Sequence, residues 1–195
     1  MMTGMHSATP ERLQLGAGVF LKNLDLTGVS SAVALRQRVA AAIAADSGVL
    51  GATRGGGTFR AVPQLRSIEA DGAGTPFVGG TVLDGWDVRM TGTLLEITPA
   101  NFADALVCAE VTTSGGMTTL RAWESLEDED YIPQLCWIGD TARGLMLIEL
   151  TGVLNVKGAA FTFRDRGEGE LPFEFRAHAD DAEQETAPFR VVFLG

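Results

Sequence analysis

The chain has 195 residues, of which 46% are hydrophobic and 21% are charged, and its net charge is −10. This length and composition fit one globular domain and exclude a disordered chain. The negative net charge argues against a protein that binds nucleic acid tightly by neutralising its phosphates. Nucleic acid could still move along such a surface without binding to it. The two cysteines lack CxxC spacing, and we expect them to be buried and reduced rather than joined in a disulfide.

The first predicted elements follow a small, polar N-terminal arm, residues 1–15, which we expect to be mobile. A strand or an extended segment with short apolar runs comes next. Apolar residues at helical spacing then predict a helix that Ser30 or Ser31 caps and that runs to about Ala45. Residues 16–195 are predicted to form a single domain.

Two long strands joined by a loop are the most distinctive prediction. The first strand runs from Thr58 to about Glu69, and Pro63 within it indicates a bulge or a sheet edge. The second strand, Val82 to Ile97, has about sixteen residues, which is far above the usual strand length. A bulge is expected near Leu94. A strand of this length projects beyond a compact domain or belongs to a larger barrel.

The second strand and the loop before it supply the candidate functional residues. Trp86, Val88 and Met90 mark the apolar face of this strand. The candidates on its opposite, polar face are Asp87, Arg89, Thr91 and Thr93. The glycine-rich loop carries an apolar pair that either docks against another surface or tucks back onto its own domain. The candidate contact residues of the loop are Asp71, Thr75, Pro76, Phe77 and Val78.

The second half of the chain is predicted to complete the sheet. Thr98–Pro99 starts a short helix that runs to about Glu110, and a turn follows at residues 112–116. Further strands are expected over residues 131–138, 145–156 and 188–193. Two phenylalanine-containing segments, residues 161–163 and 173–175, are predicted to pair as a hairpin. The expected fold is mainly β, a sandwich or partial barrel of antiparallel strands with two flanking helices.

The motifs of catalysis, cofactor binding and metal binding are weak. Residues 51–58 resemble a phosphate-binding loop, but Gly57 stands where the lysine must be, and a strand rather than a helix follows. His178 with Asp180 is a candidate catalytic pair, although an exposed histidine at a strand end is the commoner case. The acidic run at residues 127–130 lacks EF-hand spacing and predicts a solvated loop. We therefore expect no enzymatic activity, no cofactor and no metal.

Residues 51–98 resemble the tail tube (major tail) proteins of tailed bacteriophages and prophages. The resemblance rests on GATRGGGTF, on PQLRSIEADG and on GGTVLDGWDVRMTGTLLEITPANF. The C-terminal segments FTFRDRGEGELPFEFRAHAD and APFRVVF fit the same family. The resemblance covers most of the chain beyond about residue 15.

The resemblance implies a β-sandwich-like subunit with a helix at its flank. Six subunits would form a ring, and stacked rings would form a hollow tube for genome delivery, lined by one ring-wide barrel of long hairpins. It also implies contacts with tape measure, tail terminator and distal tail or baseplate proteins, and transient passage of DNA. The polar face of Asp87 to Thr93 would then line the lumen, and the loop of Asp71 to Val78 would contact the next subunit or ring.

Two other functions remain open at this point. One is the inner tube of a contractile phage tail, a phage-like bacteriocin or an injection system. The other is a ligand-binding β-barrel with Trp86, Trp123 and Trp137 as pocket candidates. The N-terminus shows no leader pattern and no apolar run reaches membrane-spanning length. We therefore expect synthesis and assembly in the bacterial host cytoplasm and a final place in the virion tail.

Overall fold

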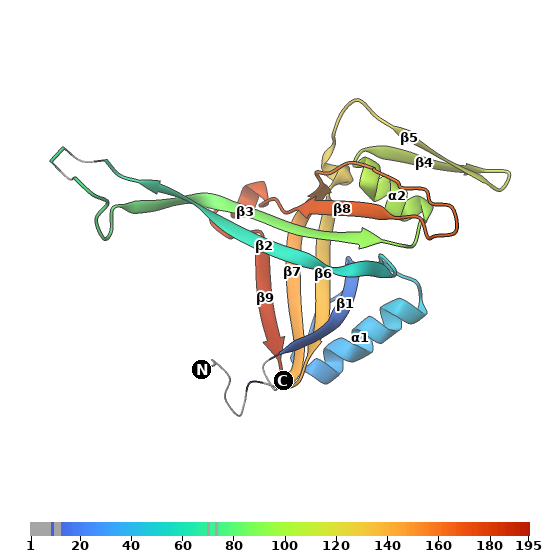
Figure 1. The fold of residues 1–195 in the computed structure, drawn as a ribbon, viewed down its shortest axis with the longest axis horizontal. Helices are drawn as coiled ribbons and strands as arrows, with labels where there is room; N and C mark the ends of the chain where they lie inside the picture. Colours follow the sequence, from blue (N-terminus) through green and yellow to red (C-terminus); the bar gives the residue numbers. More distant parts are fainter. Residues whose placement is uncertain (1–8, 10–12, 70, 73) are drawn as a thin grey trace.

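The computed structural model describes residues 9, 13–69, 71–72 and 74–195, so most of the predicted arm, residues 1–15, lies outside the described part. The described chain is mainly antiparallel β-sheet with two α-helices (Figure 1). The mainly β fold class is therefore confirmed. No helix within the described residues is long and apolar enough to cross a membrane.

The elements follow each other closely along the chain. The strands are β1 (Gln14–Lys22), β2 (Thr53–Ser67), β3 (Thr81–Leu94), β4 (Ala109–Ser114), β5 (Met117–Ala122), β6 (Ile132–Thr141), β7 (Gly144–Asn155), β8 (Leu171–Arg176) and β9 (Phe189–Leu194). The helices are α1 (Ala32–Ala44) and α2 (Pro99–Leu106), with short 3-10 turns at Asp128–Asp130 and Asp181–Glu183. The segment predicted as a strand or an extended arm is the strand β1, and the other predicted long strands are confirmed to within a few residues.

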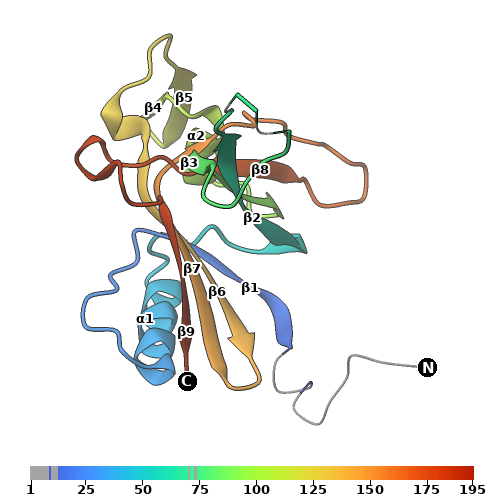
Figure 2. The same cartoon turned by 90° about the vertical axis from the view of Figure 1, so that its left-hand side faces the viewer.

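The main sheet has the strand order β1-β6-β7-β8-β3-β2, with β9 paired to β7. Strand β7 joins two layers, because one of its edges pairs with β9 over residues 145–150 and with β8 over residues 154–155. Strands β1, β6, β7 and β9 form one layer, and β8, β3 and β2 cross it as a second layer (Figures 1 and 2). In the described part of the chain the sheet ends at β1 and β2 and does not close into a barrel.

Two apolar cores lie on opposite faces of the β1-β6-β7-β9 layer. The main core fills the space between the two strand layers, and its largest members are Phe20, Met90, Leu135, Leu150, Phe173 and Phe175. The second core lies under α1, and its members include Leu21, Leu35, Cys136 and Leu147. Neighbouring residues of one strand serve different cores because strand side chains alternate between faces. Strand β7 is therefore buried on both of its faces.

Both helix starts follow the predicted capping chemistry. The Ser31 hydroxyl accepts a hydrogen bond from the backbone N–H of Ala34, and the Thr98 hydroxyl accepts one from that of Asn101. The second helix stops earlier than predicted, at Leu106 rather than near Glu110. Val107 has a φ of 74°, a conformation that a continuing helix does not allow.

The hairpin β4–β5 was missed by the sequence interpretation, which placed helix and turn there. Residues 109–114 pair with residues 117–122 around Gly115 and Gly116. Both glycines have positive φ, as a two-residue hairpin turn requires, and the strands carry several β-branched threonines and a valine. The prediction of a helix reaching Glu110 is therefore wrong.

The predicted phenylalanine hairpin is also wrong. The segment at residues 161–163 makes a single bridge, Thr162 to Glu170, while β8 pairs with β3. The reason is space in the main core: at Gly92 of β3, a Cβ atom would lie 2.5 Å from the ring of Phe173. The missing side chain at Gly92 lets the aromatic ring lie on β3, so β8 docks there. Phe163 is left exposed.

Candidate functional site

The β2–β3 hairpin extends far beyond the rest of the molecule (Figure 1) and points toward the viewer in Figure 2. Strand β8 pairs with β3 only from Arg89 onward, so residues 81–87 of β3 have only β2 beside them in the described chain. Trp86 packs edge-on against Phe189, with ring centroids 5.5 Å apart. Beyond Trp86 the hairpin is a two-stranded ribbon, which we call the projecting ribbon (residues 64–69, 71–72 and 74–85).

Proline and a bulge shape the projecting ribbon. Strand β2 is at the end of the sheet, where Pro63 can lack an N–H without breaking a ladder bond, so the predicted sheet edge is confirmed. Gln64 pairs with Gly85 and Leu65 pairs with Leu83, which leaves Asp84 as the extra residue of a bulge. The bulge predicted near Leu94 is also confirmed, because the register shifts there: Thr53 pairs with Leu94 and Gly57 with Gly92, which leaves three residues of β2 opposite Thr93 alone.

The bulge keeps apolar side chains on one face of the ribbon. Because β3 gains one residue at Asp84, Leu65 and Leu83 face the same side as Ala61 and Val88, which contact the main core. In the described chain Leu65 is 62% exposed and Leu83 is 50% exposed. The apolar face of the domain thus continues onto the ribbon, where the described residues do not cover it.

The loop at the tip of the ribbon holds the five predicted contact residues. Backbone bonds from Ile68 N to Gly80 O (2.7 Å) and from Gly80 N to Phe77 O (2.9 Å) close this loop. The Phe77 ring lies against Gly80, where a Cβ atom would come within 2.8 Å of it, so Phe77 is half-exposed. Val78 is fully exposed. Their role as contacts stays a prediction, and Val78 rather than Phe77 is the freer apolar side chain.

The four polar candidates of β3 lie together on the sheet face that points away from the main core. Asp87, Arg89, Thr91 and Thr93 are all half-buried there. The sequence interpretation missed two neighbours from β8, Glu174 and Arg176, because the pairing of β3 with β8 was not foreseen. The exposure of these side chains to a lumen stays a prediction.

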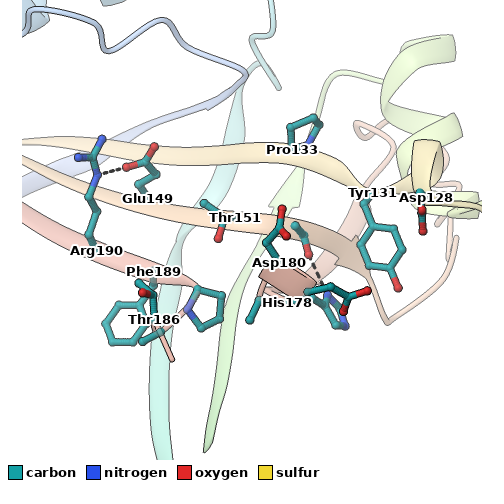
Figure 3. A pocket seen from close by; sticks show the side chains of 15 residues that line it. Asp128, Tyr131, Pro133, Glu149, Thr151, His178, Asp180, Thr186, Phe189 and Arg190 are labelled. Carbon is teal, nitrogen blue, oxygen red and sulfur yellow. Dashed lines mark hydrogen bonds and ion pairs between the residues drawn. The ribbon is translucent and has the colours of Figure 1, made fainter. Parts of the chain in front are cut away.

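A hollow of about 1050 Å³ lies beside β7, β9 and the loop at residues 178–188 (Figure 3). The His178 ring contacts Tyr131 edge-on at 5.3 Å, and its Nδ1 lies 2.8 Å from the carbonyl oxygen of Gly152. Asp180 accepts a hydrogen bond from the backbone of Ala182 instead (2.8 Å). Both members of the candidate catalytic pair thus bind backbone groups, as structural residues do.

The glycine-rich entry to β2 has its own anion partner. The Glu96 carboxylate accepts a hydrogen bond from the backbone N–H of Ala52 (2.7 Å) and lies directly against Gly51. A phosphate would need the same donors. This geometry agrees with the rejection of a phosphate-binding loop.

The three tryptophans do not share a site. Trp86 packs on Phe189, Trp137 donates its indole N–H to the carbonyl of Ala17 (2.9 Å), and Trp123 is exposed after β5. The hollow in Figure 3 is lined by other residues. The geometry therefore does not favour the hypothesis of a ligand-binding barrel whose pocket these tryptophans line.

No protein-family model matches the chain, and no curated protein sequence matches it significantly. Among the described residues no group of three or more histidine, cysteine, aspartate or glutamate side chains could hold a metal ion.

Proposed function

We propose that the chain is the structural subunit of a phage tail tube, in which rings of six copies stack into a hollow conduit for genome delivery. The observation that carries this proposal is the projecting ribbon, with its uncovered apolar face and its exposed tip. The number of subunits comes from the sequence resemblance. A tail position in the virion and contacts with tape measure, terminator and distal tail proteins follow from the same resemblance.

The energetics of the ribbon support assembly. A two-stranded hairpin is only marginally stable by itself in water. Full burial of one leucine contributes about 1.5–3 kcal/mol, so covering Leu65 and Leu83 would stabilise the ribbon considerably. In a self-assembling protein, the partner that covers these leucines is a second copy of the same chain.

The two edges of the projecting ribbon differ and are both unpaired in the described chain, which allows a head-to-tail contact between copies. In the described chain, β2 has no partner on its outer edge, and β3 has none on its β8 side over residues 81–87. Seven strand residues span about 23 Å. Pairing the β2 edge of one copy with the β3 edge of the next is a heterologous contact, and such a contact closes into a ring when the rotation fits. Closure would remove exposed edges that otherwise invite aggregation.

The polar face of the same strands suits a water-filled lumen. Side chains alternate between the two faces of a strand, so a barrel with an apolar outer contact has a polar interior. The net charge of −10 disfavours tight binding of DNA phosphates. The inner tube of a contractile tail would use the same geometry, and a sheath gene beside this one would assign it there.

The exposed tip of the ribbon gives the first test. We expect Val78→Asp to leave rings intact but to prevent their stacking, because a carboxylate in a ring-to-ring contact costs several kcal/mol to desolvate. Electron microscopy and sedimentation velocity would then show single rings in place of tubes. The matched control is Val33→Asp, which adds the same charge at another exposed valine, in the first turn of α1, where an acidic residue is favourable. Tubes of normal length from Val78→Asp would overturn the stacking role of the loop.

A further inference from the structure

Three arginines form a row across three neighbouring strands. Arg60 of β2 is directly opposite Arg89 of β3, and Arg89 is directly opposite Arg176 of β8. Like charges at directly opposite positions destabilise a sheet. A row of three in an acidic protein therefore calls for compensating charges or for an anionic ligand.

Two carboxylates lie among these arginines. Asp87 accepts hydrogen bonds from Nε of Arg89 (2.9 and 3.0 Å) and lies 3.4 Å from Nε of Arg176. Glu174 accepts a hydrogen bond from Nη1 of Arg89. Asp87 thus occupies the Nε donors of Arg89 and Arg176, which a bidentate contact with a phosphate would need.

The side chains of this cluster are all partly exposed to solvent. The side chains of Asp87 and Glu174 are 19% and 29% exposed, against 32% for Arg89 and 41% for Arg176. The hydrogen bond from Arg89 holds the pKa of Asp87 below its usual value, so this carboxylate stays ionised at neutral pH. The guanidinium groups of Arg89 and Arg176 are thus accessible from solvent although both are paired with carboxylates.

We propose that this arginine row is a polyphosphate-binding surface that Asp87 and Glu174 hold in a weak-binding state. The row spans about 10 Å across three strands, enough to face more than one backbone phosphate of a DNA duplex. Two carboxylates against three guanidinium groups leave a net charge of +1, so contacts with DNA are short-lived and the duplex can move on. The identity of the ligand as DNA rests on the proposed tube function.

The binding test uses the purified subunit at concentrations where size-exclusion chromatography shows a monomer. Fluorescence anisotropy of a labelled DNA duplex is followed through a salt titration. We expect Asp87→Asn to bind about tenfold more tightly than the unmodified chain, with a dependence of log K on log salt that is steeper by about 1, because Arg176 loses its carboxylate partner while Arg89 keeps its hydrogen bond to Glu174. Adding Arg89→Gln and Arg176→Gln to Asp87→Asn should abolish this gain.

The matched control is Asp140→Asn, which makes the same change in net charge. Asp140 pairs with Arg36 of α1 (2.6 Å), away from the arginine row, and its replacement should leave the salt slope unchanged. Glu174→Gln gives a second test that does not depend on the fold of the Asp87 variant, with an expected slope change of about 1. Equal gains from Asp87→Asn and Asp140→Asn, or no gain from both Asp87→Asn and Glu174→Gln, would overturn the proposal. Because a monomer is measured, these results do not depend on whether tubes form.

Discussion

A chain with Leu65→Asp and Leu83→Asp together should fold normally and fail to form rings. Both leucines are at least half-exposed in the subunit, so their replacement removes little burial from the fold itself. In a ring both would be covered, and losing about 3 kcal/mol of apolar burial at each contact weakens association by roughly a hundredfold. Desolvation of two carboxylates adds several kcal/mol to this loss. Multi-angle light scattering should report monomers at concentrations where the unmodified chain forms rings.

The control for the two leucine substitutions tests whether the added charge alone, at any exposed position, prevents ring formation. Val33→Asp combined with Ile43→Asp adds two carboxylates at exposed apolar positions of α1, away from the ribbon. This variant should still form rings. Circular dichroism melting should leave the transition of the α1 variant nearly unchanged. It should lower that of the Leu65 and Leu83 variant only slightly, because its two carboxylates lie directly opposite each other but on the projecting ribbon, outside the main core. Rings from the Leu65 and Leu83 variant would show that the apolar ribbon face is not the contact between subunits.

Phe173→Ala should cost about 3–5 kcal/mol of the free energy of unfolding. Phe173 is buried between the layers, packs edge-on against Phe20 at 5.3 Å and contacts Phe175 at 4.9 Å. Its ring also fills the space over Gly92, so alanine would leave a cavity where β8 meets β3. A globular domain has only about 5–15 kcal/mol of stability, and the melting temperature should fall by about 10 °C.

Phe163→Ala is the matched control for this prediction. Phe163 lies in the segment that the sequence suggested would pair with the strand of Phe173, yet it is exposed and outside the main core. Its replacement should change the free energy of unfolding by less than about 1 kcal/mol. Equal losses from the two variants, measured by urea denaturation, would contradict the pairing of β8 with β3.

Local chemistry explains what the sequence predicted well. The caps at Ser31 and Thr98 need only neighbouring residues, and both helix starts are confirmed. The long alternating strands β2 and β3 and the apolar strand β7 likewise carry their pattern within themselves. The candidate loop and the polar strand face could be named because each is a continuous stretch.

Pairing between distant segments explains what the sequence could not predict. The phenylalanine hairpin was expected from nearness in sequence, whereas the space over Gly92 and the main core favour the β3–β8 pairing. The bulge at Asp84 depends on the register of two strands, which the composition of one strand does not reveal. The arginine row likewise becomes visible only when Arg60, Arg89 and Arg176 are aligned across three strands. The turn at Gly115–Gly116, by contrast, was a local signal that the helix interpretation overlooked.

In the proposed assembly, the projecting ribbon joins copies of this chain into a hollow tube. Electron microscopy of the purified protein, concentrated and imaged in negative stain, tests it most directly. We expect sixfold rings, or tubes of uniform bore, with the β2–β3 ribbons at the inner wall. Dispersed monomers at high concentration would contradict it.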